Sequence, residues 1–179
     1  MSLGVTIRDI RMSEPHVMRR FHLLIALLVV VLDRATKWIV AKEISLHDSV
    51  PVIPGFFRLT RVENRGAAFG LFADSPTQWK IAILVLFSVV ALVIVSALLW
   101  RNSHVMTTTG IGLALILGGA VGNLWDRLLS GRVADFLVFY IGRYQWPAFN
   151  LADSAIVCGA GLLVIEILFA KTSAAEKSA

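Results

Sequence analysis

Two aspartates stand beside segments that are apolar enough to cross a bilayer. Asp135 lies in residues 133–136 (VADF), and Asp153 lies in residues 149–154 (FNLADS). An ionisable group at or near hydrocarbon is costly, so one that is retained there usually has a function. Two carboxylates that meet in such a place can share a proton and act as an acid–base pair that activates water. The sequence therefore indicates hydrolytic chemistry at an aspartate pair.

The composition is that of a membrane protein of one domain. The 179 residues are 57% hydrophobic and 16% charged, and the mean hydropathy is +0.76. A soluble globular domain is usually about a quarter charged. The basic residues behind the net charge of +5 flank apolar runs instead of forming one patch, which favours lipid headgroups over nucleic acid. We expect a single membrane-embedded domain over residues 1–179 with no nucleic-acid partner.

Metal and disulfide chemistry are not indicated. The chain has one cysteine, Cys158, in an apolar run, where a small packing role is the expected one. The four histidines are scattered along the chain, and their spacing matches no zinc motif. The sequence thus predicts no metal and no other cofactor.

Four segments are long enough to cross a hydrocarbon core of about 30 Å as helices. The two middle segments each contain a long uncharged run, the last contains only Asp153 and Glu166 as charged residues, and the first is polar in its second half. All five tryptophans fall at or near the proposed ends, as interfacial tryptophans do. The sequence predicts a mainly α-helical, integral membrane bundle of four transmembrane helices at about 21–41, 79–100, 105–126 and 149–170.

The first span is expected to set the orientation. It is expected to be retained, because charged residues and not a small-residue cleavage site follow it. Arg19 and Arg20 directly precede it, which favours both chain ends in the cytoplasm. Segments of about 42–78 and 127–148 then lie outside, and residues 1–17 and 172–179 are expected as solvated tails.

The two outer segments differ in pattern. Residues 50–62 mix β-branched and aromatic residues with Pro and Gly, which predicts a small extracytoplasmic β-sheet on the membrane surface. Residues 132–140 carry apolar side chains at roughly helical spacing, which favours a short helix lying in the interface.

Polar clusters recur where the spans meet the outer side. This one-sided placement predicts a site that opens at the outer leaflet, whereas a transport path would need polar groups through the full depth. The small-residue pairs Gly118/Gly122 and Ala155/Gly159 could let the third and fourth spans approach closely. The clusters are residues 33–37 (DRATK), 63–69 (ENRGAAF), 118–127 (GGAVGNLWDR), 133–136 and 149–154.

Several of these residues also have structural explanations. Asp33 and Lys37 are spaced for an intrahelical ion pair, and Asp126 with Arg127 could form a structural salt bridge as readily as a substrate contact. Asn150 could be a helix N-cap with Asp153 in the first turn, whereas no capping role explains Asp135. A proton-coupled transporter and a membrane-anchored scaffold therefore remain as alternative functions.

The ordered clusters resemble the lipoprotein signal peptidase (signal peptidase II) family. The resemblance runs from about Phe21 to Ala170, and its departures are Arg34 where Gln is common and Arg65 where Thr is common. Five blocks match in order: Asp-x-x-x-Lys at 33–37, Asn-x-Gly-Ala-Ala-Phe at 64–69, Gly-Asn-x-x-Asp-Arg at 122–127, Val-x-Asp-Phe at 133–136 and Phe-Asn-x-Ala-Asp at 149–153.

The resemblance implies a fold, a reaction and a set of residues. The fold has four transmembrane helices, a small periplasmic sheet and a periplasmic helix near the site. The reaction is cleavage of a diacylglyceryl-modified prolipoprotein just before its lipid-bearing cysteine, in the bacterial inner membrane, by an enzyme that we expect to be monomeric. The implied roles are a catalytic dyad of Asp135 and Asp153, substrate-binding or site-supporting roles for Asn64, Gly66, Asn123, Arg127 and Asn150, and structural roles for Asp33, Lys37 and Asp126.

Overall fold

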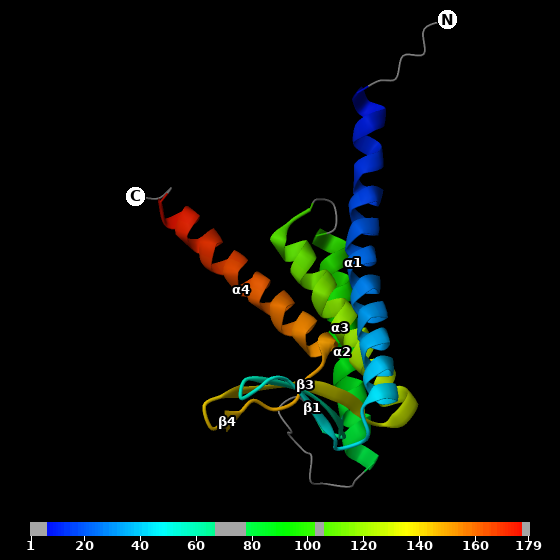
Figure 1. The fold of residues 1–179 in the computed structure, drawn as a ribbon. Helices are drawn as coiled ribbons and strands as arrows, with labels where there is room; N and C mark the ends of the chain where they lie inside the picture. Colours follow the sequence, from blue (N-terminus) through cyan, green and yellow to red (C-terminus); the bar gives the residue numbers. More distant parts are fainter. Residues whose placement is uncertain (1–6, 67–77, 103–105, 177–179) are drawn as a thin grey trace, which may run out of the picture.

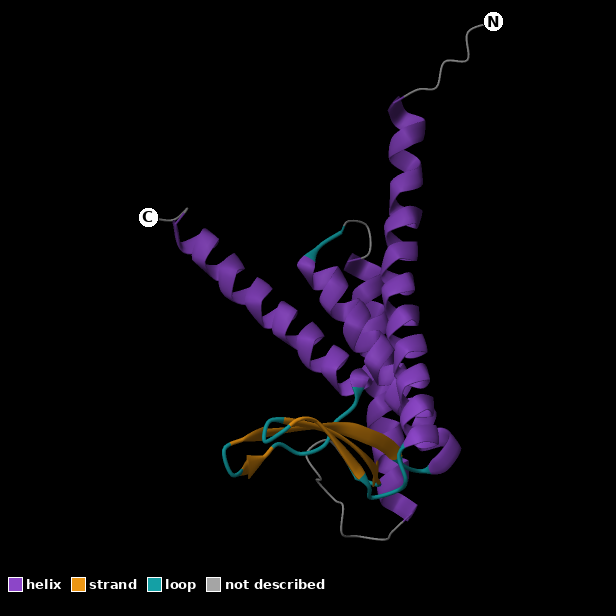
Figure 2. Ribbon diagram, in the orientation of Figure 1, coloured by secondary structure: helices purple, strands orange, loops and turns teal. Residues whose placement is uncertain are grey.

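A computed structural model describes residues 7–66, 78–102 and 106–176. Long helices form a bundle, and a small sheet lies across one end of it (Figure 1). Helices and strands are separated in space, with all strands at that one end (Figure 2). The elements in chain order are α1 (Ile7–Glu43), β1 (Ser49–Ile53), β2 (Phe57–Asn64), α2 (Gln78–Asn102), α3 (Thr108–Ser130), β3 (Val133–Ile141), β4 (Tyr144–Gln145) and α4 (Leu151–Glu176).

Helix α3 is the centre of the bundle and contacts α1, α2 and α4. Its glycines let the neighbouring helices come close. A Cβ at Gly118 would lie 2.6 Å from the Ala26 carbonyl oxygen of α1, and one at Gly112 would lie 2.8 Å from the Gly159 carbonyl oxygen of α4. The expected close approach of α3 and α4 is therefore present, but Gly118 serves the contact with α1.

Three helices of the described chain are long and apolar enough to cross a membrane: Ile81–Asn102, Thr108–Ser130 and Leu151–Phe169. They correspond to the last three predicted spans. Helix α1 covers the first predicted span but is not among the three, and its stretch 21–41 contains Asp33, Arg34 and Lys37. Helix α1 also begins at Ile7 and α4 continues to Glu176, so parts of both expected tails are helical.

The sheet has the strand order β1-β2-β3-β4, and all neighbouring strands are antiparallel. Strands β1 and β2 confirm the sheet predicted for residues 50–62. In the β2–β3 pair, Val62 lies opposite Asp135 and Asn64 opposite Val133, with a register shift between Leu59 and Val62. This pairing places the end of β2 beside the aspartate of β3.

The predicted interfacial helix at 132–140 is wrong, because this segment is strand β3. A short continuous apolar run fits a helix or a strand equally well by periodicity alone. The segment forms a strand because its backbone pairs with β2 along most of its length. The periplasmic helix that the family resemblance implies is not at this position, and residues 67–77 lie outside the described chain.

Candidate active site

Asp135 is a buried carboxylate near the start of β3, with only 3% of its surface exposed. Two side-chain amides hold it. The Asn64 Nδ2 donates to Asp135 Oδ2 at 3.0 Å, and the Asn150 Nδ2 donates to Asp135 Oδ1 at 2.8 Å. The strand register brings Asn64 to this carboxylate. Both oxygens of Asp135 thus accept a fixed hydrogen bond.

Asn64 is itself oriented by the backbone that follows it. The amide nitrogen of Gly66, a buried residue, donates to Asn64 Oδ1 at 2.8 Å. With its carbonyl oxygen occupied in this way, the Asn64 side chain presents its NH₂ group to Asp135. Gly66 therefore supports the site through its backbone. The rest of this block, residues 67–69, lies outside the described chain.

Asp153 lies in the first turn of α4 and combines two tasks. Its backbone N–H donates to Asn150 Oδ1 at 2.9 Å, while the Asn150 N–H donates to Asp153 Oδ2 at 3.3 Å. This reciprocal pair is a capping box, so the capping explanation is correct. The second oxygen, Oδ1, accepts a 2.7 Å hydrogen bond from Asn123 Nδ2 of α3. Capping and membership of the polar cluster are thus compatible.

Asn150 connects the two aspartates. It is fully buried, it caps α4 beside Asp153, and its NH₂ group reaches Asp135. The preceding residue explains this reach: Phe149 forms an antiparallel bridge to Leu137 and is hydrogen-bonded to β3. The chain therefore leaves β3 and starts α4 at a point where one side chain contacts both acidic residues.

A buried ionic cluster underlies the pair. Lys37 Nζ lies 2.8 Å from Asp33 Oδ2 and 2.7 Å from Asp126 Oδ2, and it donates to Asn123 Oδ1 at 3.3 Å. The predicted Asp33–Lys37 ion pair is therefore present. Asp33 Oδ1 also accepts the Ala152 N–H at 3.1 Å, which satisfies a free amide in the first turn of α4. The cluster joins α1, α3 and α4, and it contacts the aspartate pair through Asn123, which accepts from Lys37 and donates to Asp153.

Arg127 lies one residue after Asp126, near the end of α3. Its guanidinium interacts electrostatically with Asp153, Asp135 and Asp126. Its Nε atom is buried and forms no hydrogen bond within the part of the chain that the structure describes. The partner of Asp126 is instead the pair Lys37 and Arg34, with Arg34 Nη2 at 2.6 Å.

The pKa of the Asp135 carboxyl is raised to about 7. Burial is the largest cause, and the nearby negative charge of Asp153 acts in the same direction. The hydrogen bonds from Asn64 and Asn150 and the positive charge of Lys37 lower the pKa and offset only part of this rise. A carboxyl that titrates near neutral pH is suited to acid–base catalysis.

Metal ligands do not gather here. In the described ranges, no group of three or more His, Cys, Asp or Glu side chains is arranged to hold a metal ion. The carboxylates of Asp135 and Asp153 therefore lie among the amide groups of asparagines, the Lys37 ammonium and the Arg127 guanidinium.

Comparison with known proteins assigns the family. The family model described as signal peptidase (SPase) II matches residues 25–169. The chain belongs to the signal peptidase II family. The lipoprotein signal peptidase of Solibacter usitatus is 46% identical over 154 residues, which cover 86% of this chain and 94% of that protein. The lipoprotein signal peptidase of Desulforapulum autotrophicum is 49% identical over 152 residues, which cover 83% and 91%.

Solved structures agree with this assignment. Two structures, each described as a bacterial membrane enzyme, match with TM-scores of 0.77 and 0.73 at 31% and 32% identity. They cover 86% and 83% of this chain, and 90% and 92% of their own chains. Signal peptidase II is a protease family. Because three helices are long and apolar enough to cross a membrane and the similar structures are membrane enzymes, the chain is an integral membrane protein.

The ten site residues predicted from the sequence all take part in this network of contacts, but one further member is not among them. In the sequence, Arg34 stands out only as a departure from the signal peptidase II pattern, yet it forms an ion pair with Asp126. A weak signal was available, because Arg34 lies three residues before Lys37 on the same helix. Both cations contact the same carboxylate.

Proposed function

We propose that this protein is an intramembrane aspartic endopeptidase. Its substrate would be a diacylglyceryl-modified prolipoprotein, cut just before the lipid-bearing cysteine to release the signal peptide. The observation that carries the proposal is the bridging of Asp135 and Asp153 by the single buried side chain of Asn150. The lipoprotein signal peptidases of similar sequence support the choice of substrate.

The proposed reaction uses the two aspartates as a dyad. Two carboxylates in a poorly hydrated site do not both ionise readily, so one keeps a proton near neutral pH. The ionised carboxylate takes a proton from water as the water attacks the scissile carbonyl, and the neutral carboxyl donates to the carbonyl oxygen. The raised pKa of Asp135 supports this division of labour. No serine or cysteine nucleophile is required, so no acyl-enzyme forms.

Substrate positioning falls to the donors around the dyad. The buried Nε of Arg127, which has no hydrogen-bond partner in the described chain, is a candidate donor to a peptide carbonyl. Asn64 and Asn123 already bond to the aspartates and would hold the carboxylates in place while the substrate binds. Gly66 and Asn150 support them, and Asp33, Lys37 and Asp126 act structurally beneath.

We further propose that α1 is the fourth transmembrane helix. The distribution of its polar and apolar side chains is the reverse of that in a soluble protein. His22, Asp33 and Lys37 are buried, whereas Leu24 and Leu28 are each 57% exposed. An apolar outer face with polar groups turned inward is what lipid requires. The same pattern continues on α2, where Phe87 is 71% exposed.

This arrangement gives a topology for the proposed enzyme. The start of α1 and the end of α4 lie at the end of the bundle opposite the sheet (Figure 1). With both chain ends in the cytoplasm, the dyad faces the periplasmic side of the inner membrane. The acyl chains of the substrate then stay in the outer leaflet, where each buried CH₂ contributes about 0.8 kcal/mol to anchoring. One copy of the chain contains both aspartates, so a monomer suffices.

A proton-coupled transporter fits less well. It would need ionisable groups through the depth of the bundle. Among residues 18–66, 79, 81–102 and 106–169, whose side chains the structure describes, the buried charged groups all lie at the sheet end, and His22 is the one buried polar side chain toward the opposite end.

The test is cleavage by single variants. Asp135→Asn and Asp153→Asn should insert normally and show no processing of a lipidated prolipoprotein in a gel-shift assay. Glu43→Gln is the matched control, because this carboxylate lies at the same end of the bundle with its side chain 65% exposed. Normal turnover by a well-inserted Asp135→Asn protein would refute the mechanism. Failure of either variant to insert would instead favour the scaffold alternative.

A further inference from the structure

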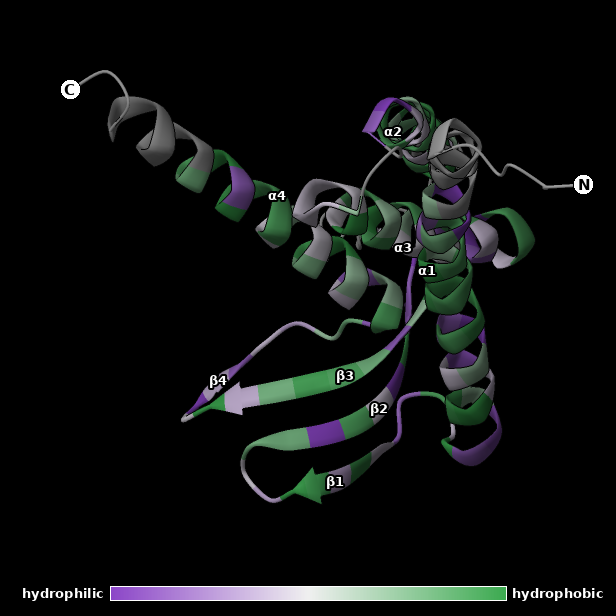
Figure 3. Cartoon of the chain, turned by 90° about the horizontal axis from the view of Figure 1, so that it is seen from above, coloured by the Kyte–Doolittle hydropathy of each residue, from purple (hydrophilic) through white to green (hydrophobic). Residues whose placement is uncertain are grey.

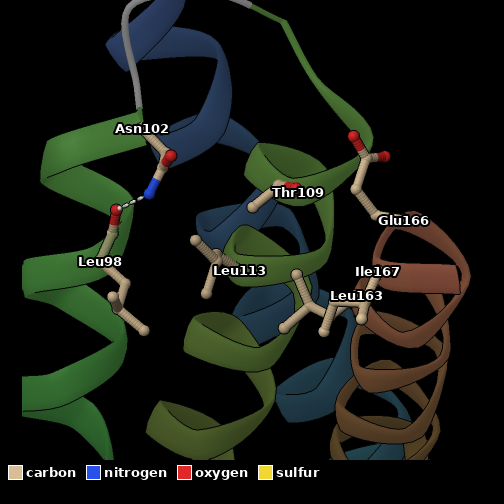
Figure 4. Close-up of a pocket in the computed structure, with 7 residues that line it drawn as sticks. All are labelled: Leu98, Asn102, Thr109, Leu113, Leu163, Glu166 and Ile167. Carbon is tan, nitrogen blue, oxygen red and sulfur yellow. Dashed lines mark hydrogen bonds between the residues drawn. The ribbon is translucent and has the colours of Figure 1, made fainter. Parts of the chain in front are cut away.

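A groove opens at the end of the bundle opposite the aspartates. Helix α4 diverges from α3 toward its C-terminal end, as Figures 1 and 3 both show, and the space between them has a volume of about 180 Å³. This is below the roughly 300–1,000 Å³ of typical small-molecule sites, so the groove suits side chains of a packed segment. Its apolar wall is formed by Leu98 of α2, Leu113 of α3, and Leu163 and Ile167 of α4 (Figure 4).

Three polar residues, Asn102, Thr109 and Glu166, complete the lining of the groove, and Glu166 is the one among them that carries a charge. Glu166 of α4 lies at its open edge, above Leu163 (Figure 4). None of the salt bridges among the described side chains involves Glu166. The helix positions three and four residues away on either side hold Leu, Leu, Phe and Ala, so no cation stands at the spacing of an intrahelical pair.

The position of Glu166 makes a carboxylate without an ion-pair partner among the described side chains unusual. In the proposed topology it lies toward the cytoplasmic surface, where anionic lipids attract cations and the chain itself would be expected to carry Lys or Arg. A carboxylate beside apolar side chains at the membrane interface is partly desolvated and gains from a cationic partner. A cationic segment of another molecule would provide that partner.

We propose that this groove binds the signal-peptide helix of the substrate and that Glu166 pairs with its basic N-terminal segment. The inference rests on the proposed function. A signal peptide has a positively charged start, an apolar segment of about 7–15 residues and then the cleavage site. Glu166 lies about 13 residues beyond Asp153 on α4, which is about 20 Å at 1.5 Å per residue. A helical signal peptide cut at the dyad thus brings its basic residues to the level of Glu166.

The groove would then act as a specificity element for the length and charge of the signal peptide. Glu166 is remote from the dyad, so it contributes to binding and leaves the chemical step unchanged. Removing its charge should raise KM for substrates with a basic start and leave kcat the same.

The test compares two synthetic diacylglyceryl prolipoprotein peptides that carry either two lysines or two glutamines before the apolar segment, and a third peptide carries two glutamates there for the charge-reversed variant. The enzyme is placed in phosphatidylcholine nanodiscs, which carry no net lipid charge. Wild type should show a KM about fivefold lower for the lysine peptide, the scale of one partly screened ion pair. Glu166→Gln should abolish this difference, Glu166→Lys should favour a peptide with two glutamates, and Glu43→Gln should behave as wild type.

Equilibrium binding of the corresponding fluorescent signal peptides separates this inference from the proposed function. Binding needs no cleavage, so a wild-type protein that cleaves neither peptide refutes the proposed function, whereas equal affinity for the lysine and glutamine peptides refutes the inference. Cleavage of both peptides with full lysine preference retained in Glu166→Gln refutes the inference alone. An effect of Glu166→Gln on peptide affinity that depends on added phosphatidylethanolamine and not on the charge of the peptide would assign Glu166 to a lipid headgroup and overturn the proposal.

Discussion

Asn150 donates a 2.8 Å hydrogen bond to Asp135 with the same side chain whose oxygen caps the helix of Asp153. One residue therefore sets the distance between a strand and a helix that each carry an acidic group. The side chain is fully buried, so neither contact can be replaced by bulk water.

Asn150→Asp separates the two tasks of this residue. Aspartate is as good an N-cap as asparagine, so α4 should form and the protein should insert. The substituted side chain has no NH₂ donor for Asp135 and adds a negative charge beside it. We expect processing of the lipidated prolipoprotein to fall by about 100-fold or more, the scale of losing one fixed donor in an active site.

A cap substitution elsewhere is the control. Thr107 caps α3 by accepting the Gly110 N–H at the opposite end of the bundle. Thr107→Asp should therefore leave turnover unchanged. Comparable turnover by Asn150→Asp and wild type would show that the contact with Asp135 has no catalytic consequence.

Lys37→Met should destabilise the protein by about 3–5 kcal/mol, the cost of removing one partner from a buried ionic group. The substitution keeps an unbranched side chain but leaves the carboxylates of Asp33 and Asp126 without their shared cation. Thermal unfolding in detergent measures the effect. Lys42→Met is the control, because the Lys42 side chain is 64% exposed. Equal unfolding temperatures for the two variants would contradict the supporting role of the cluster.

The sequence predicted the members of this site better than it predicted their supports. Asp33 and Lys37 were expected to pair, and Asn150 was expected to cap, because both contacts lie within one helical turn. The contacts of Lys37 with Asp126 and of Asn150 with Asp135 join separate elements. No local sequence pattern therefore predicts these contacts. The strand at Val133–Ile141 was missed for a related reason, since its apolar run became a strand only by pairing with β2.

Gly118→Ala tests the packing of α1 on α3. A methyl group at this position would lie 2.6 Å from the Ala26 carbonyl oxygen and 2.7 Å from the Val29 side chain. Backbone cannot move aside cheaply, so we expect a loss of about 1–3 kcal/mol in unfolding free energy. In Gly161→Ala the new methyl group has no described atom within 4 Å, and that variant should be as stable as wild type. Unfolding temperatures of the two variants in one detergent decide the question.

Asp135→Asn should gain stability relative to wild type as the pH rises toward neutral, even though we expect it to abolish activity. The folded-state pKa of Asp135 is about 7, whereas an unfolded aspartate titrates near about 3.9. Between these values the folded state binds the extra proton, so wild-type stability falls as the pH rises through this window and levels off above pH 7. The loss is on the order of a few kcal/mol at most. Asparagine carries no charge at any pH and escapes this penalty.

The unfolding temperature of Asp135→Asn relative to wild type should therefore rise from pH 5 to pH 7 and then stay constant. Asp48→Asn, at an exposed position in the loop after α1, provides the matched control and should follow wild type across the range. A constant difference between Asp135→Asn and wild type at every pH would show that the Asp135 carboxyl titrates at an ordinary value. In that case its burial would not poise it for proton transfer, and the acid–base role proposed for it would lose its physical basis.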